Sequence, residues 1–155
     1  MPRTDPELPF FVYGTLLPGE PNHDLFLRDR AIAEQPALLP GALLYEGPGY
    51  PYAIEGHGTV RGTLVTAAPA VYAELLVLLD RLEEYAGPGH PRNLYERVAR
   101  EVRLPGAVPP ASGTARAWVY LAAAPVTRTL RTGGIPIPGG DWLTRRPPPP
   151  APRTP

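Results

Sequence analysis

Runs and alternations of apolar residues along the chain predict five short strands. FFVY at residues 10–13 is a continuous apolar run, whereas TVRGTLV at 59–65 alternates with a period of two. The predicted strands, in chain order, cover residues 10–13, 37–45, 59–65, 95–104 and 114–121. In the fourth of these the alternation places Val98, Val102 and Leu104 on one face. This pattern is typical of strands that bury one face against a core.

Two further segments are expected to be helical. The clearer one is PAVYAELLVLLDRLEEY at 69–85, which opens with a proline and stops at a cluster of Gly and Pro. A second helix is expected to lead through HDLFLRDRAIAEQ at 23–35, with Asn22 at its N-cap and Asp24 in its first turn. Because strands and helices do not alternate as βαβ units, the sequence predicts an α+β fold with a small, barrel-like sheet.

The 155 residues suffice for one domain with a hydrophobic core. We expect this domain over residues 8–144. A Gly- and Pro-rich loop is expected inside it at 46–58, and the strand before that loop is interrupted by a Pro-Gly pair. The remaining segment, RRPPPPAPRTP at 145–155, is expected to be a disordered or polyproline II tail.

Composition excludes several function classes. The chain has 15 basic and 15 acidic residues, so there is no basic excess for nucleic acid. Every basic residue is arginine and cysteine is absent, which removes disulfides, thiolate chemistry, Schiff-base lysines and P-loop lysines. No apolar run approaches the roughly 20 residues of a membrane span, and the N-terminus has no apolar signal segment. A cytoplasmic protein that acts without a membrane is therefore expected.

The usual catalytic constellations are also missing. His23, His57 and His90 have no second ligand at helical or strand spacing, so structural or surface roles are favoured and neither a metal nor a cofactor is expected. Ser112, the only serine, lies in a loop without a nucleophile elbow. The glycine turn after the first strand matches neither nucleotide-binding fingerprint. Any catalysis is expected to come from carboxylates, tyrosines and backbone amides.

One carboxylate at the end of the long helix stands out. Residues three, four and seven positions apart share a helix face, and for Glu83 these positions include Leu79 and Leu76. A carboxylate on that apolar stripe loses solvation and lies near Asp80, and both effects would raise its pKa toward the range that a proton shuttle needs. The alternative, a charged and frayed helix end, fits Glu84 better, because an ion pair with Arg81 is available to it.

A series of short motifs extends over residues 10–142. The motifs are Tyr13-Gly14-Thr15-Leu16, Asn22, LYEGPGYPYAI, V-x-G-x-L at Val60 to Leu64, LDxxE at Leu79 to Glu83, YxR at Tyr95 to Arg97, and Gly140-Asp141-Trp142. Their ordered combination resembles the γ-glutamylcyclotransferase-like, or AIG2-like, family, which includes γ-glutamylamine cyclotransferase.

The resemblance implies a small mixed β-barrel flanked by helices. It also implies a cyclotransferase that closes a γ-glutamyl amine or amide to 5-oxoproline and releases the amine, with Glu83 as general acid and base. By the same resemblance, the γ-glutamyl group would be bound through the backbone of Tyr13, Gly14, Thr15 and Leu16. Tyr95 is expected either to donate a hydrogen bond to the substrate or to pack in the core with its hydroxyl satisfied.

The sequence departs from the family pattern in two places. Glu84 stands where the family commonly has glycine, and the linker between Glu83 and Tyr95 carries an extra Gly- and Pro-rich segment that could reshape the acceptor side of the pocket. Arg97, in an alternating strand, is expected to face solvent rather than bind a carboxylate.

Two other functions stay open. One is a non-enzymatic domain of the same fold that binds a small metabolite, and the other is a cyclotransferase acting on a γ-glutamyl-acylated biosynthetic intermediate. The expected partner is a small γ-glutamyl molecule, and the expected state is a monomer or a weak homodimer.

Overall fold

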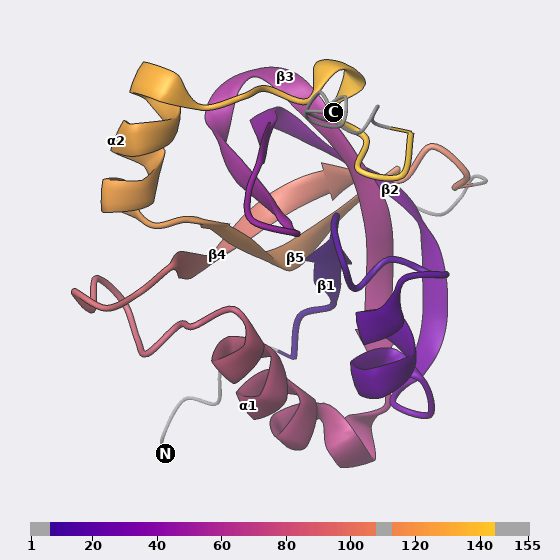
Figure 1. Ribbon diagram of the computed structural model, residues 1–155. Coiled ribbons are helices and arrows are strands. Elements are labelled where there is room, and N and C mark those ends of the chain that lie inside the picture. Colours follow the sequence, from indigo (N-terminus) through magenta and orange to yellow (C-terminus); the bar gives the residue numbers. More distant parts are fainter. Residues whose placement is uncertain (1–6, 108–112, 145–155) are drawn as a thin grey trace, which may run out of the picture.

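The strands close into a five-stranded barrel in the computed structural model, which describes residues 7–107 and 113–144 (Figure 1). They are β1 (Phe10–Val12), β2 (Ala31–Glu46), β3 (Pro51–Ala67), β4 (Tyr95–Arg103) and β5 (Thr114–Ala122). Their order around the barrel is β1-β3-β2-β4-β5. Neighbours are antiparallel except β1 and β5, which pair in parallel. The expected small mixed barrel is therefore confirmed.

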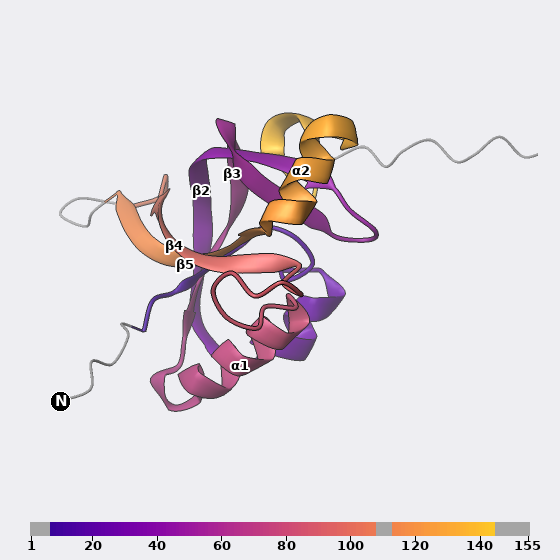
Figure 2. The same ribbon diagram turned by 90° about the vertical axis from the view of Figure 1, so that its left-hand side faces the viewer.

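Helices cover the barrel from two sides. The helical elements are η1 (His23–Leu27), η2 (Pro69–Val71), α1 (Tyr72–Leu82), α2 (Ala124–Gly133) and η3 (Pro138–Gly140). Figures 1 and 2 show α1 across one end of the barrel and α2 near the other. The helix expected from the 69–85 pattern is thus present. Helix α2 was not predicted from the sequence, although Pro125 near its start is a recognised helix signal.

The predicted helix over residues 23–35 is wrong beyond Leu27. The helical turn ends there, Asp29 takes a left-handed φ of 67°, and β2 begins at Ala31. Gln35 precedes Pro36, a position that disfavours the helical region, and both residues pair with β3 instead. Pairing in the sheet therefore prevails over the helical character of the segment.

The hairpin of β2 and β3 forms most of the barrel wall, and it is longer than the sequence predicted. The Pro-Gly interruption is a bulge inside β2, where the register shifts between Pro40 and Ala42 and Gly41 has a φ of 73°. Such a bulge bends a strand, as closure of a small barrel requires. The loop predicted at 46–58 is wrong beyond residue 50, because β3 begins at Pro51.

The core lies inside the barrel and beneath α1. Its largest fully buried side chains are Phe10, Phe11, Leu27, Leu44, Val60, Val65, Leu75, Leu79, Val102 and Val119. From α1, Leu75 and Leu79 are completely buried, and each contributes about 2 kcal/mol of hydrophobic stabilisation. This packing fixes the end of α1 against the barrel. The predicted proline-rich tail at 145–155 lies outside the described residues.

A close approach between β1 and β3 depends on Gly62. A Cβ at this position would lie 2.3 Å from the carbonyl oxygen of Val12 and 2.7 Å from the ring of Phe11. Because Val12 pairs with Thr63, backbone would have to move to admit a methyl group. The glycine in V-x-G-x-L thus allows β1 to lie close to β3.

Gly62→Ala is expected to lower the free energy of unfolding by about 1–3 kcal/mol, since overpacking displaces backbone. Gly133→Ala, in the last position of α2 with no atom within 4 Å of its added Cβ, is the matched control. It is expected to be neutral or slightly stabilising. Denaturant unfolding of the three proteins measures both effects, and equal stability of Gly62→Ala and wild type would contradict the close approach.

Candidate functional site

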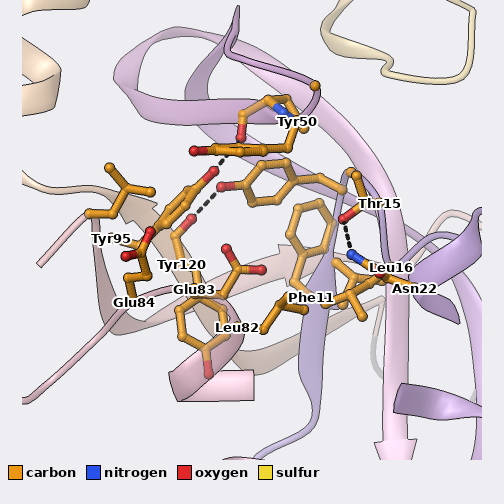
Figure 3. A pocket seen from close by; sticks show the side chains of 16 residues that line it. Phe11, Thr15, Leu16, Asn22, Tyr50, Leu82, Glu83, Glu84, Tyr95 and Tyr120 are labelled. Atoms are coloured by element: carbon orange, nitrogen blue, oxygen red, sulfur yellow. Dashed lines mark hydrogen bonds between the residues drawn. The ribbon is translucent and has the colours of Figure 1, made fainter. Parts of the chain in front are cut away.

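A pocket of about 250 Å³ lies where β1 runs into the glycine turn. Its lining residues are Phe11, Val12, Tyr13, Gly14, Thr15, Leu16, Asn22, Gly49, Tyr50, Pro51, Leu82, Glu83, Glu84, Leu94, Tyr95 and Tyr120. These residues come from the turn, the β2–β3 connection, the end of α1 and strands β4 and β5 (Figure 3). The lining contains two carboxylates and no arginine or histidine.

Glu83 follows the last residue of α1, and its side chain points into the pocket (Figure 3). Its backbone N–H donates to the carbonyl of Leu79 at 2.9 Å, so the residue still continues the helix and its apolar face, as the spacing predicted. Burial raises the pKa of Glu83 from an ordinary 4.5 to about 7. Within the described residues its carboxylate has no hydrogen-bond or ion-pair partner. This group can therefore both accept and donate a proton near neutral pH.

The turn opposite Glu83 is held in place from two sides. Gly14 lies so close to Pro51 that a Cβ would be 2.7 Å from the proline Cγ and Cδ. Asn22 donates from Nδ2 to the hydroxyl oxygen of Thr15 at 2.9 Å. Asn22 was expected to cap a helix, but it makes no capping hydrogen bond and fixes the turn instead. The glycine and the asparagine of the motif series thus both shape the turn.

Free backbone donors remain in this turn. It closes with a hydrogen bond from the N–H of Leu17 to the carbonyl of Gly14 at 3.0 Å. In the part of the chain that the structure describes, the N–H groups of Gly14, Thr15 and Leu16 donate to no other protein group. Buried or half-buried N–H groups normally have an acceptor. Donors of this kind are suited to an anionic or carbonyl oxygen of a ligand.

The tyrosines of the lining use their hydroxyls within the protein. Tyr13 donates to the carbonyl of Tyr120, and Tyr95 donates to the carbonyl of Pro51 at 2.6 Å. Burial first, and then the charge of Glu83, raises the pKa of Tyr13 well above its usual value. Burial is also the main cause of the raised pKa of Tyr95. Both side chains therefore stay neutral, and the hydroxyl proton of Tyr95 is used within the protein while its ring lines the pocket.

A polar network joins α1 to the barrel one turn before Glu83. Asp80 Oδ1 accepts hydrogen bonds from Arg97 Nε at 2.9 Å and from the Tyr120 hydroxyl at 2.6 Å. The guanidinium of Arg97 lies over the rings of Trp118 and Tyr85, with its Cζ 4.4 Å and 5.3 Å from the ring centres. The expectation that Arg97 faces solvent is wrong, because the ion pair and both rings hold it against the protein.

Glu84 also departs from expectation. The structure contains no ion pair between Glu84 and Arg81, and within the described residues the Glu84 carboxylate has no ion-pair partner. The backbone of Glu84 has a φ of 50°, so the chain leaves the helix here and the side chain does not follow the helical face. Its carbonyl accepts the N–H of Leu94 at 3.1 Å, which fixes this conformation. The exposed side chain lies at the edge of the pocket.

Asn93 is a residue that the sequence analysis missed. Its side chain is buried, accepts the N–H of Ala86 at 2.7 Å, and donates to the Gly87 carbonyl and to Glu96 Oε2, each at 2.7 Å. The extra segment between α1 and β4 is therefore ordered around one amide. An asparagine in a Gly- and Pro-rich loop carries no signal of burial in the sequence.

Metal ligands do not gather in the described ranges, 7–107 and 113–144, where no group of three or more His, Asp or Glu side chains could hold an ion. His23 is less isolated than its spacing suggested, since its Nε2 lies 2.6 Å from Glu34 Oε1. None of the helices among these residues is long and apolar enough to cross a membrane.

Known proteins share both the sequence pattern and the barrel. Residues 10–144 match the family described as gamma-glutamyl cyclotransferase, AIG2-like. A gamma-L-glutamyl-butirosin B gamma-glutamyl cyclotransferase from Niallia circulans is 36% identical over 111 residues. The match covers 72% of this chain and 64% of that relative, so the chain spans a little less than two thirds of its length.

Solved structures agree with this assignment. The crystal structure of an AIG2-like protein from Mus musculus has a TM-score of 0.56 at 26% identity, covering 75% of this chain and 77% of that one. The solution structure of the ytfP protein from Escherichia coli has a TM-score of 0.53 at 25% identity and covers 88% and 97%. The fold and the sequence match lead to one conclusion: this chain belongs to the AIG2-like γ-glutamyl cyclotransferase family.

Proposed function

We propose that this protein closes the γ-glutamyl group of an amine or amide to 5-oxoproline and releases the amine, with Glu83 as general acid and base. The observation that carries the proposal is the unpaired Glu83 carboxylate, with its pKa near 7, inside a pocket that faces three unused backbone N–H groups. This reaction needs no nucleophile from the protein, because the attacking amine belongs to the substrate.

The turn from Tyr13 to Leu16 would hold the γ-glutamyl group. The N–H groups of Gly14, Thr15 and Leu16 are the available donors for its carbonyl and carboxylate oxygens. Neutral donors must bind the substrate's α-carboxylate, since no cationic side chain lines the pocket. Ring closure also requires a folded substrate chain, so the fixed position of this turn supports the reaction through orientation.

The chemical steps balance with one carboxylate. Glu83 first takes a proton from the substrate's α-ammonium, and the resulting amine forms a bond to the γ-carbonyl carbon. The carbonyl oxygen becomes an oxyanion, which free backbone N–H groups stabilise; a donor of this kind contributes roughly 3 kcal/mol in other enzymes. Glu83 then passes protons from the new ring nitrogen to the leaving nitrogen. One of these protons reaches the leaving nitrogen before the old carbon–nitrogen bond breaks, so the amine departs neutral. It then takes the second proton, which Glu83 holds, and this regenerates the carboxylate.

Glu83→Gln is expected to lower 5-oxoproline formation by at least about 100-fold, because the amide cannot carry a proton between the two nitrogens. The measurement is product formation from a panel of γ-glutamyl amines and dipeptides. Glu101→Gln, on the exposed surface of β4, is the matched control and should keep activity. Activity that survives in Glu83→Gln would contradict the assigned role. Binding of panel compounds without any turnover would favour the non-enzymatic binding domain.

The rate should depend on pH through the ionisation of Glu83. Because the base must be unprotonated and its pKa is about 7, kcat/KM should fall tenfold per pH unit as the pH drops below about 7. Initial rates between pH 5 and pH 9 measure this decrease in kcat/KM. A rate that stays constant down to pH 5 would show that the pKa of the base is not raised from 4.5, the ordinary value for a glutamate, and would contradict the burial of Glu83.

The same burial should lower stability at high pH. Between pH 4.5 and about 7 the folded state binds more protons at Glu83 than the unfolded state, so the free energy of unfolding falls as pH rises. Above pH 7 Glu83→Gln should therefore be more stable than wild type by about 1–3 kcal/mol, and the difference should shrink toward pH 4.5. Denaturant unfolding at pH 8 and pH 4.5 tests this. A difference that does not change with pH would mean that the carboxylate is well solvated.

A further inference from the structure

The charged side chains that line the pocket are all acidic. Its lining carries the carboxylates of Glu83 and Glu84 and no basic side chain. Glu83 is assigned to proton transfer, and the proposed reaction does not use the carboxylate of Glu84. Glu84 also has no ion-pair partner among the described residues, and its side chain is exposed. A carboxylate at the mouth of a binding pocket with no internal counter-charge attracts positive charge from solution.

The backbone keeps Glu84 at that mouth. Its φ of 50° is unfavourable for a residue with a side chain, and a glycine would adopt it without cost. The conformation is fixed by two hydrogen bonds, from its own N–H to the Arg81 carbonyl at 3.2 Å and from the N–H of Leu94 to its carbonyl at 3.1 Å. The side chain therefore leaves the helix direction and lies beside the pocket rather than beside Arg81.

An aromatic wall stands next to this carboxylate. The rings of Tyr50, Tyr52 and Tyr95 pack together, with ring centres 5.1 Å to 6.4 Å apart, and Tyr50 and Tyr95 line the pocket. Burial and the neighbouring Tyr50 chiefly raise the pKa of Tyr52, and the charges of Glu84 and Glu83 add to this shift, so the field of both carboxylates reaches the wall. Tyrosine faces beside a carboxylate are a favourable environment for an ammonium group.

The two ends of the pocket have different chemistry. In Figure 3, Glu83 lies between Glu84 on one side and Thr15 with Asn22 on the other. The γ-glutamyl head is assigned to the turn that contains Thr15. The amine that leaves must then extend past Glu83 toward Glu84 and the aromatic wall.

We propose that Glu84 is a specificity-determining residue that favours γ-glutamyl amides whose leaving amine carries a second positive charge. The inference rests on the proposed cyclotransferase activity, and Glu84 takes no part in proton transfer. It acts by attracting the distal ammonium of the leaving amine while Glu83 and the turn act on the head. An amide that ends in a carboxylate would be repelled by the same group.

The test compares three γ-glutamyl amides of similar length, made with diaminobutane, pentylamine and aminopentanoate, which end in a cation, a neutral methyl and an anion. Wild type should show the highest kcat/KM for the cation and the lowest for the anion. In Glu84→Gln the ratio of the cationic to the neutral amide should fall up to about fivefold, as for an exposed ion pair. Glu84→Asp should retain most of the preference, and added salt should weaken it in wild type.

Glu101→Gln, which removes an exposed carboxylate away from the pocket, is the matched control and should leave the ratio unchanged. A ratio that stays the same in Glu84→Gln, while all three amides are still converted, would overturn the inference and leave the proposed activity intact. Failure of every amide to react would instead count against the proposed activity.

A binding measurement distinguishes failure of the inference about Glu84 from failure of the proposed activity. Calorimetric titration of the three amides into the Glu83→Gln protein measures the charge preference without turnover. Tighter binding of the cationic amide, lost when Glu84→Gln is added, supports the inference even if none of the three amides is converted. Equal affinities for the three amides would overturn it.

Discussion

The geometry of the site depends on the hydrogen bonds that the Asp80 carboxylate accepts. It accepts hydrogen bonds from Arg97 on β4 and from Tyr120 on β5, and it lies one helical turn before Glu83. The carbonyl of Tyr120 in turn accepts the hydroxyl of Tyr13 at the start of the glycine turn. One carboxylate thereby links the end of α1, two barrel strands and the turn after β1, so the proposed base and its donors keep a fixed separation.

The helix end holds two carboxylates in opposite environments. Asp80 is paired with the guanidinium of Arg97 and accepts the hydroxyl of Tyr120. Glu83, three residues later, is half-buried and has no hydrogen-bond or ion-pair partner for its carboxylate among the described residues, and burial raises its pKa to about 7. A buried unpaired charge lowers stability, and sites that do chemistry commonly carry such a cost. The contrast supports a structural role for Asp80 and the proposed proton-transfer role of Glu83.

Much of this arrangement could be predicted from short-range pattern. The 3.6-residue period that buries Leu75 and Leu79 also placed Glu83 on the core-facing stripe, and alternation located β4 and the second half of β3. The misses involve contacts that sequence spacing does not encode. Residues 31–35 form a strand because β3 pairs with them. Arg97 points toward the protein because its guanidinium contacts Asp80, 17 positions away in the sequence, and the ring of Trp118. The left-handed backbone of Glu84 likewise depends on Leu94, in a loop that Asn93 organises.

The two ends of the pocket are held by different parts of the fold. The turn after β1 and Glu83 are fixed by barrel contacts and by the Asp80 network. Glu84 is fixed by the segment between α1 and β4, which is ordered around the Asn93 amide. Changes in that segment can therefore alter the mouth of the pocket without moving Glu83 or the turn that is proposed to hold the γ-glutamyl group. The same barrel can therefore support one reaction on different amines, with the preference set at residues such as Glu84.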